Sequence, residues 1–176
     1  MTRLLVILAI TISSMLYAQK TEFSKEALSS TFLNTSEKEV SLSEILANHK
    51  GKTVLIEIWA SWCSDCVAAM PKIKEIQEKF SDIDYVFISM DKTFNAWIEG
   101  IEKHNIVGDH YFSDIPWKES EFAKSIDLDW IPRYMVVNSK GEISLFKAVK
   151  PNDKNLIKAI SIENNGKSNG GLRAKK

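Results

Sequence analysis

The two cysteines of the chain lie three residues apart, where an apolar strand passes into a helix. The run Thr53–Trp59 is almost continuously apolar and β-branched, which predicts a strand buried on both faces. Cys63 and Cys66 follow it, and apolar residues recur at helical spacing over Ser64–Phe80. A thiol at a helix N-terminus meets unpaired N–H groups and the positive end of the helix dipole, which lower its pKa. We therefore expect a redox-active pair in which Cys63 is the nucleophile and the more buried Cys66 resolves the mixed disulfide.

A Cys-x-x-Cys pair has two other uses, and the rest of the sequence argues against both. The same spacing forms half of a zinc site, but the chain has no second Cys-x-x-Cys and no paired histidines. A purely structural disulfide here would close a short loop and constrain the unfolded chain little. His49, His104 and His110 lack partners at ligand or triad spacing, so we expect them on the surface or in loops. We expect no metal and no cofactor.

The remaining apolar patterns predict a single α/β domain. Asp84–Met90 is a second buried strand, and it should run parallel to the first through a right-handed crossover. Tyr134–Val137 and Glu142–Ala148 flank the turn Asn138–Gly141 and predict a hairpin. The other expected elements are an N-terminal hairpin (Thr31–Asn34 and Glu39–Ser41), a helix after the capping box Ser41–Glu44, a helix over Phe94–Ile101, a short helix Glu119–Ile126 and a final helix capped by Asn152.

The two ends of the chain differ from this domain in composition. Residues 4–12 are apolar, follow one positive charge and precede small residues up to Ala18, which is typical of a secretory signal peptide. We expect cleavage near Ala18, and the alternative is an uncleaved N-terminal membrane anchor. Residues 164–176 carry four positive charges and few apolar side chains, which predicts a disordered basic tail. The chain then divides into a signal peptide (1–18), a lead segment (19–29), the domain (30–163) and the tail (164–176).

The overall charge argues against one class of partner. The chain has 23 lysines and arginines and 23 aspartates and glutamates, which gives a net charge of zero. A protein that binds nucleic acid by bulk electrostatics needs a basic excess. We therefore expect no nucleic-acid partner.

The residues around the cysteines resemble the active site of the thioredoxin family. Val54–Cys66 is similar to the thioredoxin active-site strand and loop, and Trp130–Arg133 and 138–142 resemble its cis-proline loop and hairpin. The capping box before Gly51 and the run Phe87–Asp91 are more similar to the TlpA/ResA branch of secreted thiol–disulfide oxidoreductases. The resemblance covers about residues 30–162. It implies a thioredoxin fold, with a central mixed β-sheet flanked by helices and the N-terminal β-hairpin as an extension.

The resemblance also implies roles for residues beside the cysteines. Pro132 would be cis and would face the two cysteines, and Ile131 would offer its backbone to an extended substrate segment. Trp62 would flank the nucleophile, whereas Trp59 is expected in the core. Many relatives have proline immediately before the second cysteine. Asp65 stands there instead, and its negative charge should raise the pKa values of the thiols.

One carboxylate on the first strand is a further candidate. Glu57 lies six residues before Cys63, where thioredoxins carry a buried carboxylate. Burial among apolar neighbours should raise its pKa, which would suit proton exchange with Cys66. The alternative is that Glu57 reaches solvent at the strand end or pairs with a lysine such as Lys52.

Together these features predict a thiol–disulfide oxidoreductase that reduces protein disulfides in the periplasm or cell envelope. We expect it to be a monomer whose partners are proteins with disulfides and a membrane thiol-transfer protein that donates electrons. Two alternatives remain open. A peroxiredoxin-like antioxidant protein shares the fold, but its Thr-x-x-Cys motif needs threonine where this chain has Ala60. A non-catalytic binding or copper-delivery module would use the same groove without turnover.

Overall fold

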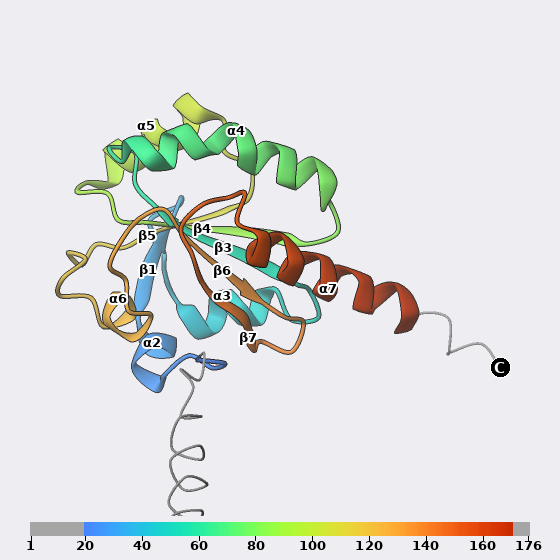
Figure 1. Cartoon of the computed structure of the whole chain (residues 1–176). Helices are drawn as coiled ribbons and strands as arrows, with labels where there is room; N and C mark the ends of the chain where they lie inside the picture. The colour runs from blue at the N-terminus through green and yellow to red at the C-terminus, as the bar shows by residue number, and fades with distance from the viewer. Residues whose placement is uncertain (1–19, 171–176) are drawn as a thin grey trace, which may run out of the picture.

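The computed structural model describes residues 20–170, with side chains through residue 164. A mixed sheet of seven strands forms the centre of this part of the chain, and helices cover both of its faces (Figure 1). The strands are β1 (Thr31–Asn34), β2 (Glu39–Ser41), β3 (Val54–Trp59), β4 (Asp84–Ser89), β5 (Asp109–Phe112), β6 (Arg133–Val137) and β7 (Ile143–Ala148). The helices are α2 (Lys25–Ser29), α3 (Leu42–Asn48), α4 (Ser64–Lys79), α5 (Phe94–His104), α6 (Glu121–Ser125) and α7 (Lys154–Gly170). Across the sheet the strand order is β2-β1-β5-β4-β3-β6-β7.

The strand β3 lies inside the sheet and leads into the cysteine motif. All six of its residues are buried, which explains why its sequence is apolar without alternation. It pairs in parallel with β4 and antiparallel with β6. The parallel β3–α4–β4 unit confirms the predicted strand–helix–strand arrangement. The residues after Trp59 therefore emerge at the carboxyl end of the parallel strands, which is the edge where open α/β sheets commonly bind their ligands.

The helix α4 positions the two cysteines and packs against the sheet. Its N-cap residue is Cys63, and it contains Pro71. Met70, Ile73 and Ile76 are buried as predicted, whereas Val67 is only half-buried. In Figure 1, α4 and α5 lie on one side of the sheet, and α2, α3 and α6 lie on the other. The motif is therefore fixed by a helix that buries a full apolar face.

Most predicted elements are present, and two were missed. The N-terminal hairpin has the predicted bounds, and both hydrogen bonds of the capping box between Ser41 and Glu44 form. β5 was not predicted because only Tyr111 and Phe112 are buried in it, which is too short a pattern to recognise. α2 is a single short helix of five residues capped by Ser24, and such helices carry no full apolar period.

The ends of the domain differ from the prediction in detail. Asp153, rather than Asn152, accepts from the first N–H groups of α7, with its Oδ1 2.7 Å from the Asn155 nitrogen. α7 runs to Gly170, past the boundary predicted at residue 163. The predicted signal peptide (1–18) and residues 171–176 lie outside the described residues. Between residues 20 and 170, no helix has the length and apolar character needed to cross a bilayer.

The expectation for His49 was wrong, because its side chain is buried. It is 6% exposed at the end of α3, and its Nδ1 lies 2.9 Å from Asp84 Oδ2. Its Nε2 lies 3.3 Å from Asp109 Oδ2, close enough for an ion pair but without hydrogen-bond geometry. Asp84 and Asp109 begin β4 and β5, so His49 links α3 to the starts of two parallel strands. His104 and His110 are half-buried.

Candidate active site

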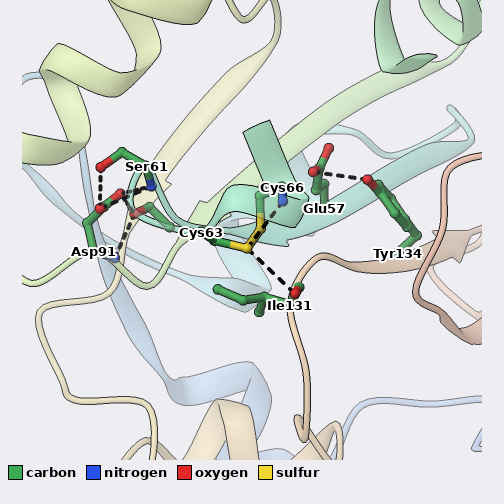
Figure 2. The surroundings of a disulfide bond; sticks show 8 residues. Glu57, Ser61, Cys63, Cys66, Asp91, Ile131 and Tyr134 are labelled. Carbon is green, nitrogen blue, oxygen red and sulfur yellow. Dashed lines mark hydrogen bonds between the residues drawn. A yellow bond between two sulfur atoms is a disulfide. The ribbon is translucent and has the colours of Figure 1, made fainter. Parts of the chain in front are cut away.

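The two cysteines are joined by a disulfide at the first turn of α4 (Figure 2). Their Cα atoms are 5.3 Å apart, and the Cys66 N–H donates to Cys63 Sγ over 3.2 Å. Cys63 is 8% exposed and Cys66 is fully buried. In the reduced state the Cys63 sulfur would keep its place at the N-cap of α4, where the helix dipole stabilises a thiolate. Of the two sulfurs, Cys63 is therefore the one that a substrate can reach.

A cis peptide bond lies beside the disulfide, in the loop that precedes β6. The Ile131–Pro132 bond is cis, which agrees with the prediction, and the Ile131 carbonyl oxygen lies 3.6 Å from Cys63 Sγ. The β3–β6 register places Arg133 opposite Ile58, so Pro132 is level with the last residue of β3 and Ile131 lies beyond the end of that strand. Because Cys63 also lies beyond that end, the antiparallel pairing of two strands brings the proline loop against the nucleophile.

Glu57 is a buried carboxylate on β3. It is 1% exposed, and its Oε1 accepts a hydrogen bond from the Tyr134 hydroxyl over 3.2 Å (Figure 2). Its Oε2 has no partner among the described residues. Burial raises the pKa of Glu57 to about 8, although the Tyr134 hydrogen bond opposes the shift. Lys52 pairs with Asp84 instead, with 3.6 Å between Nζ and Oδ1, so the alternative in which it neutralises Glu57 is excluded.

Exposed tryptophans surround the accessible sulfur. Trp62 is 55% exposed and Trp130 is 57% exposed, whereas Trp59 is fully buried, as predicted. The two exposed tryptophans line a largely apolar hollow of about 350 Å³. Its lining residues are Trp62, Cys63, Ser64, Asp65, Trp117, Asp129, Trp130 and Ile131. Trp117, which the sequence analysis did not single out, is fixed by a 2.7 Å hydrogen bond from its Nε1 to the Leu128 carbonyl. A larger hollow of about 750 Å³ includes His49 and Asp84 and contains neither cysteine.

Arg133, the residue after the cis proline, is buried, which was not predicted from the sequence. Its side chain is fully buried, and it donates to the carbonyls of Ile126 and Asp127 over 2.9 and 3.1 Å and to the Asp129 carboxylate. Burial lowers the pKa of the guanidinium, and the Asp129 charge opposes this. Arg133 thus ties the segment after α6 to the start of β6, next to the proline loop.

Replacing Arg133 with methionine is expected to lower the free energy of unfolding by about 2 kcal/mol, because the buried Ile126 carbonyl and the part-buried Asp127 carbonyl lose a charged donor while the side-chain volume is largely kept. Urea unfolding of the oxidised protein measures this. Lys124→Met is the control: Lys124 is exposed and forms an ion pair with the exposed Glu121, so we expect a change below about 0.5 kcal/mol. Equal effects of the two substitutions would show that the Arg133 hydrogen bonds contribute nothing specific.

A second polar cluster lies on the other side of the cysteine loop and was also missed. Asp91 is 6% exposed, and its carboxylate accepts from the Ser61 N–H, the Ser61 hydroxyl and the Ser89 hydroxyl. Ser61 lies two residues before Cys63, so this carboxylate holds the loop that carries the nucleophile (Figure 2). No periodic pattern marks such a contact, because the two partners are 30 residues apart.

A mixed sheet in which an internal strand leads into a Cys-x-x-Cys pair at a helix N-terminus, beside a cis-proline loop, defines a thioredoxin-type dithiol protein. The comparison with protein families agrees: the model of the Thioredoxin-like family matches residues 51–143. The matched segment spans more than half of the chain and contains both cysteines and Pro132. The chain therefore belongs to the Thioredoxin-like family.

Individual relatives are distant. The chain is similar to Thioredoxin H8 of Arabidopsis thaliana, with 35% identity over 48 residues, 27% of this chain and 32% of the relative. It covers only 16% and 20% of the next two curated relatives, so it spans a minor part of the proteins it matches. Among solved structures, a Bacteroides vulgatus protein described as a thiol-disulfide oxidoreductase is 28% identical, with a TM-score of 0.61 over 82% of this chain and 88% of that chain. A secreted disulfide oxidoreductase of Mycobacterium tuberculosis has a TM-score of 0.60 over 79% and 99%, and at 16% identity it supports the fold alone.

Proposed function

We propose that this protein is a thiol–disulfide oxidoreductase that reduces disulfide bonds in other proteins. The observation that carries the proposal is the asymmetry of the cysteine pair: Cys63, at the N-cap of α4, is 8% exposed and lines the apolar hollow, whereas Cys66 is fully buried. A nucleophile must reach the substrate, and a resolving thiol must reach only the nucleophile. Family membership supports the same chemistry.

The proposed reaction transfers two electrons from the dithiol to the substrate. The Cys63 thiolate attacks one sulfur of the substrate disulfide, the substrate S–S bond breaks, and its second sulfur leaves as a thiolate that takes up a proton. Cys66 then loses its proton and attacks Cys63 Sγ. The mixed disulfide breaks, the second substrate thiol is released, and the Cys63–Cys66 disulfide forms. An external dithiol must return two electrons and two protons before the next cycle.

Glu57 is the proposed acceptor of the Cys66 proton. It is buried, as Cys66 is, and its raised pKa of about 8 means that it can take up and release a proton near neutral pH. Its Oε2, which has no hydrogen-bond partner within residues 20–170, leaves one oxygen of the carboxylate available.

Trp62, Ile131 and Pro132 are the proposed contacts for the substrate segment around the attacked sulfur. The Ile131 carbonyl lies against Cys63 Sγ, and the tryptophans give the hollow beside it an apolar wall. Extended backbone at the proline loop could pair with a substrate strand, while the hollow takes an apolar side chain.

The direction of electron flow and the place of action are part of this proposal. Asp65 is exposed and has no ion-pair partner within residues 20–170, so its charge disfavours a thiolate nearby and favours reduction of substrates. We propose that the protein acts as a monomer in the periplasm or cell envelope, with electrons from a membrane thiol-transfer protein. The signal-like N-terminus supports this location.

The equilibrium reduction potential of the Cys63–Cys66 couple tests the direction. We expect a value at or below about −250 mV in thiol redox buffers followed by tryptophan fluorescence, as for thioredoxin-type reductases. The same protein should reduce insulin with dithiothreitol as the electron source. A potential near about −120 mV would make the protein an oxidant and would contradict the reductase assignment while leaving the dithiol chemistry in place.

A further inference from the structure

A buried carboxylate accepts hydrogen bonds from the loop that leads to the nucleophile. Asp91 lies two residues after the end of β4. Its Oδ1 accepts from the Ser61 hydroxyl over 2.7 Å, and its two oxygens lie 3.1 and 3.0 Å from the Ser61 nitrogen. The Ser89 hydroxyl donates to Oδ2 over 2.7 Å and accepts from the Asp91 N–H over 2.9 Å. Each of the hydrogen bonds to the carboxylate comes from an N–H or O–H donor, so both oxygens of Asp91 act as acceptors.

The same loop is confined from the opposite direction. A Cβ placed on Gly100 of α5 would lie 2.6 Å from Ser61 Cβ and 3.3 Å from the Trp59 ring, so the helix backbone rests directly on the loop. The Met90 N–H donates to the Trp59 carbonyl over 2.8 Å, and the Cys63 N–H donates to the Ala60 carbonyl over 3.1 Å. The segment 60–63 is therefore a tight turn clamped between Asp91 and α5.

We propose that Asp91 is a positioning residue for Cys63: its carboxylate fixes the turn that presents the nucleophile, and its charge biases the Cys63–Cys66 couple toward the disulfide. This inference rests on the proposed function and deepens it, because a couple that favours its disulfide is the stronger reductant.

The expected size of the charge effect follows from distance. Ser61 and Cys63 are two Cα steps apart, so the Asp91 charge lies on the order of 10 Å from the Cys63 sulfur. At that separation a unit charge changes an ionisation equilibrium by about twofold in bulk water and by about 15-fold at an effective dielectric constant of about 20, so we take an intermediate effect of about fivefold for this partly buried site. Asp65 and Asp129 line the hollow at Cys63, and Glu57 is buried on β3; these carboxylates stay unchanged in the variants below.

Asp91→Asn removes the charge and keeps the shape of the side chain. We expect the equilibrium constant of the couple to move about fivefold toward the dithiol, a change of about 20 mV for two electrons. In the Cys66→Ser background, where Cys63 is the single thiol, its alkylation profile should shift to lower pH. On the acid side of the midpoint, the alkylation rate should rise about fivefold. Asp84→Asn is the matched control, since Asp84 is hydrogen-bonded at the other end of β4, and both readouts should stay within about twofold of the wild type.

Ser61→Ala separates the effect of the hydrogen bond that holds the turn from the effect of the Asp91 charge. It removes the hydrogen bond from the Ser61 hydroxyl to Asp91 but keeps the hydrogen bond from the backbone N–H and the carboxylate itself. The reduction potential of the Cys63–Cys66 couple should therefore remain at the wild-type value. The kcat/KM for insulin should fall about threefold, because the turn before Cys63 is less firmly held. This variant also tests the positioning role if Asp91→Asn fails to fold.

Three results would overturn the inference. A potential and alkylation profile of Asp91→Asn equal to those of Asp84→Asn would remove the charge effect. Wild-type turnover by Ser61→Ala would remove the positioning role, and a potential shift in Ser61→Ala as large as that in Asp91→Asn would assign the effect to the loop alone. Failure of the proposed function is distinct, since it would appear as no reduction of insulin by the wild-type protein, whereas potential and alkylation would still report on Asp91.

Discussion

Replacing Cys66 with serine is expected to arrest the protein as a stable mixed disulfide between Cys63 and its substrate. The first attack still occurs, because Cys63 keeps its position at the N-cap of α4. The second step has no thiol, so multiple turnover of insulin should fall by a factor on the order of 10³. The measurement is a covalent adduct on non-reducing gels that dithiothreitol dissolves, together with the turnover rate.

Cys63→Ser is the control for this trapping experiment. It leaves the buried Cys66 as the sole thiol, and we expect neither adduct nor turnover, because a fully buried sulfur cannot meet a protein substrate. Both variants lose the same short-range disulfide, so differences between them report on the roles of the two sulfurs and not on the cross-link. An adduct formed by Cys63→Ser, with none in Cys66→Ser, would reverse the assignment of nucleophile and resolving thiol.

The apolar framework of the site could be predicted from sequence because it is periodic and local. The β3 run, the helix after it and the hairpin around Gly141 each carry their signal within a few adjacent residues. The cysteine pair needed only its place at a strand–helix junction. The cis proline followed from resemblance, since no residue near Pro132 signals the isomer by itself.

The polar contacts that hold the site could not be predicted, because their partners are distant in sequence. Ser61 and Asp91 are 30 residues apart, and His49 and Asp84 are 35 residues apart. A buried polar side chain is stable only with its hydrogen-bond partner, and the sheet order decides which partner is near. In the sequence His49 has the features of a loop residue, and it is buried because the fold places the starts of β4 and β5 beside it. Arg133 is likewise buried only because nearby backbone carbonyls and Asp129 accept from it.

Glu57 is the exception among the buried polar residues, since its burial could be predicted from the apolar residues around it. Ionising its carboxyl group in the folded protein lowers the free energy of unfolding. Its pKa in the folded protein is about 8, against an ordinary value of 4.5. The folded state therefore holds the proton more tightly than the unfolded chain. Stability from this group is fully present below pH 4.5 and is lost as the pH rises through about 8.

Glu57→Gln is therefore expected to become more stable than the wild type as the pH rises. Glutamine mimics the protonated carboxyl and can still accept from Tyr134, so at pH 5 the two proteins should be similar in stability. Between pH 5 and pH 8 the wild type should lose about 3 kcal/mol relative to the variant, because each unit of pKa difference corresponds to about 1.4 kcal/mol. Urea unfolding of the oxidised proteins at both pH values measures this difference.

Glu78→Gln is the matched control for this experiment, because Glu78 is exposed on α4 and its removal should leave the pH dependence unchanged. The proposed proton transfer adds a second expectation: Glu57→Gln should be the more stable protein at pH 8 and yet the slower reductase. Parallel stability curves for Glu57→Gln and the wild type would show that Glu57 is ionised in the folded protein without cost, and would remove the physical basis for its role as a proton acceptor.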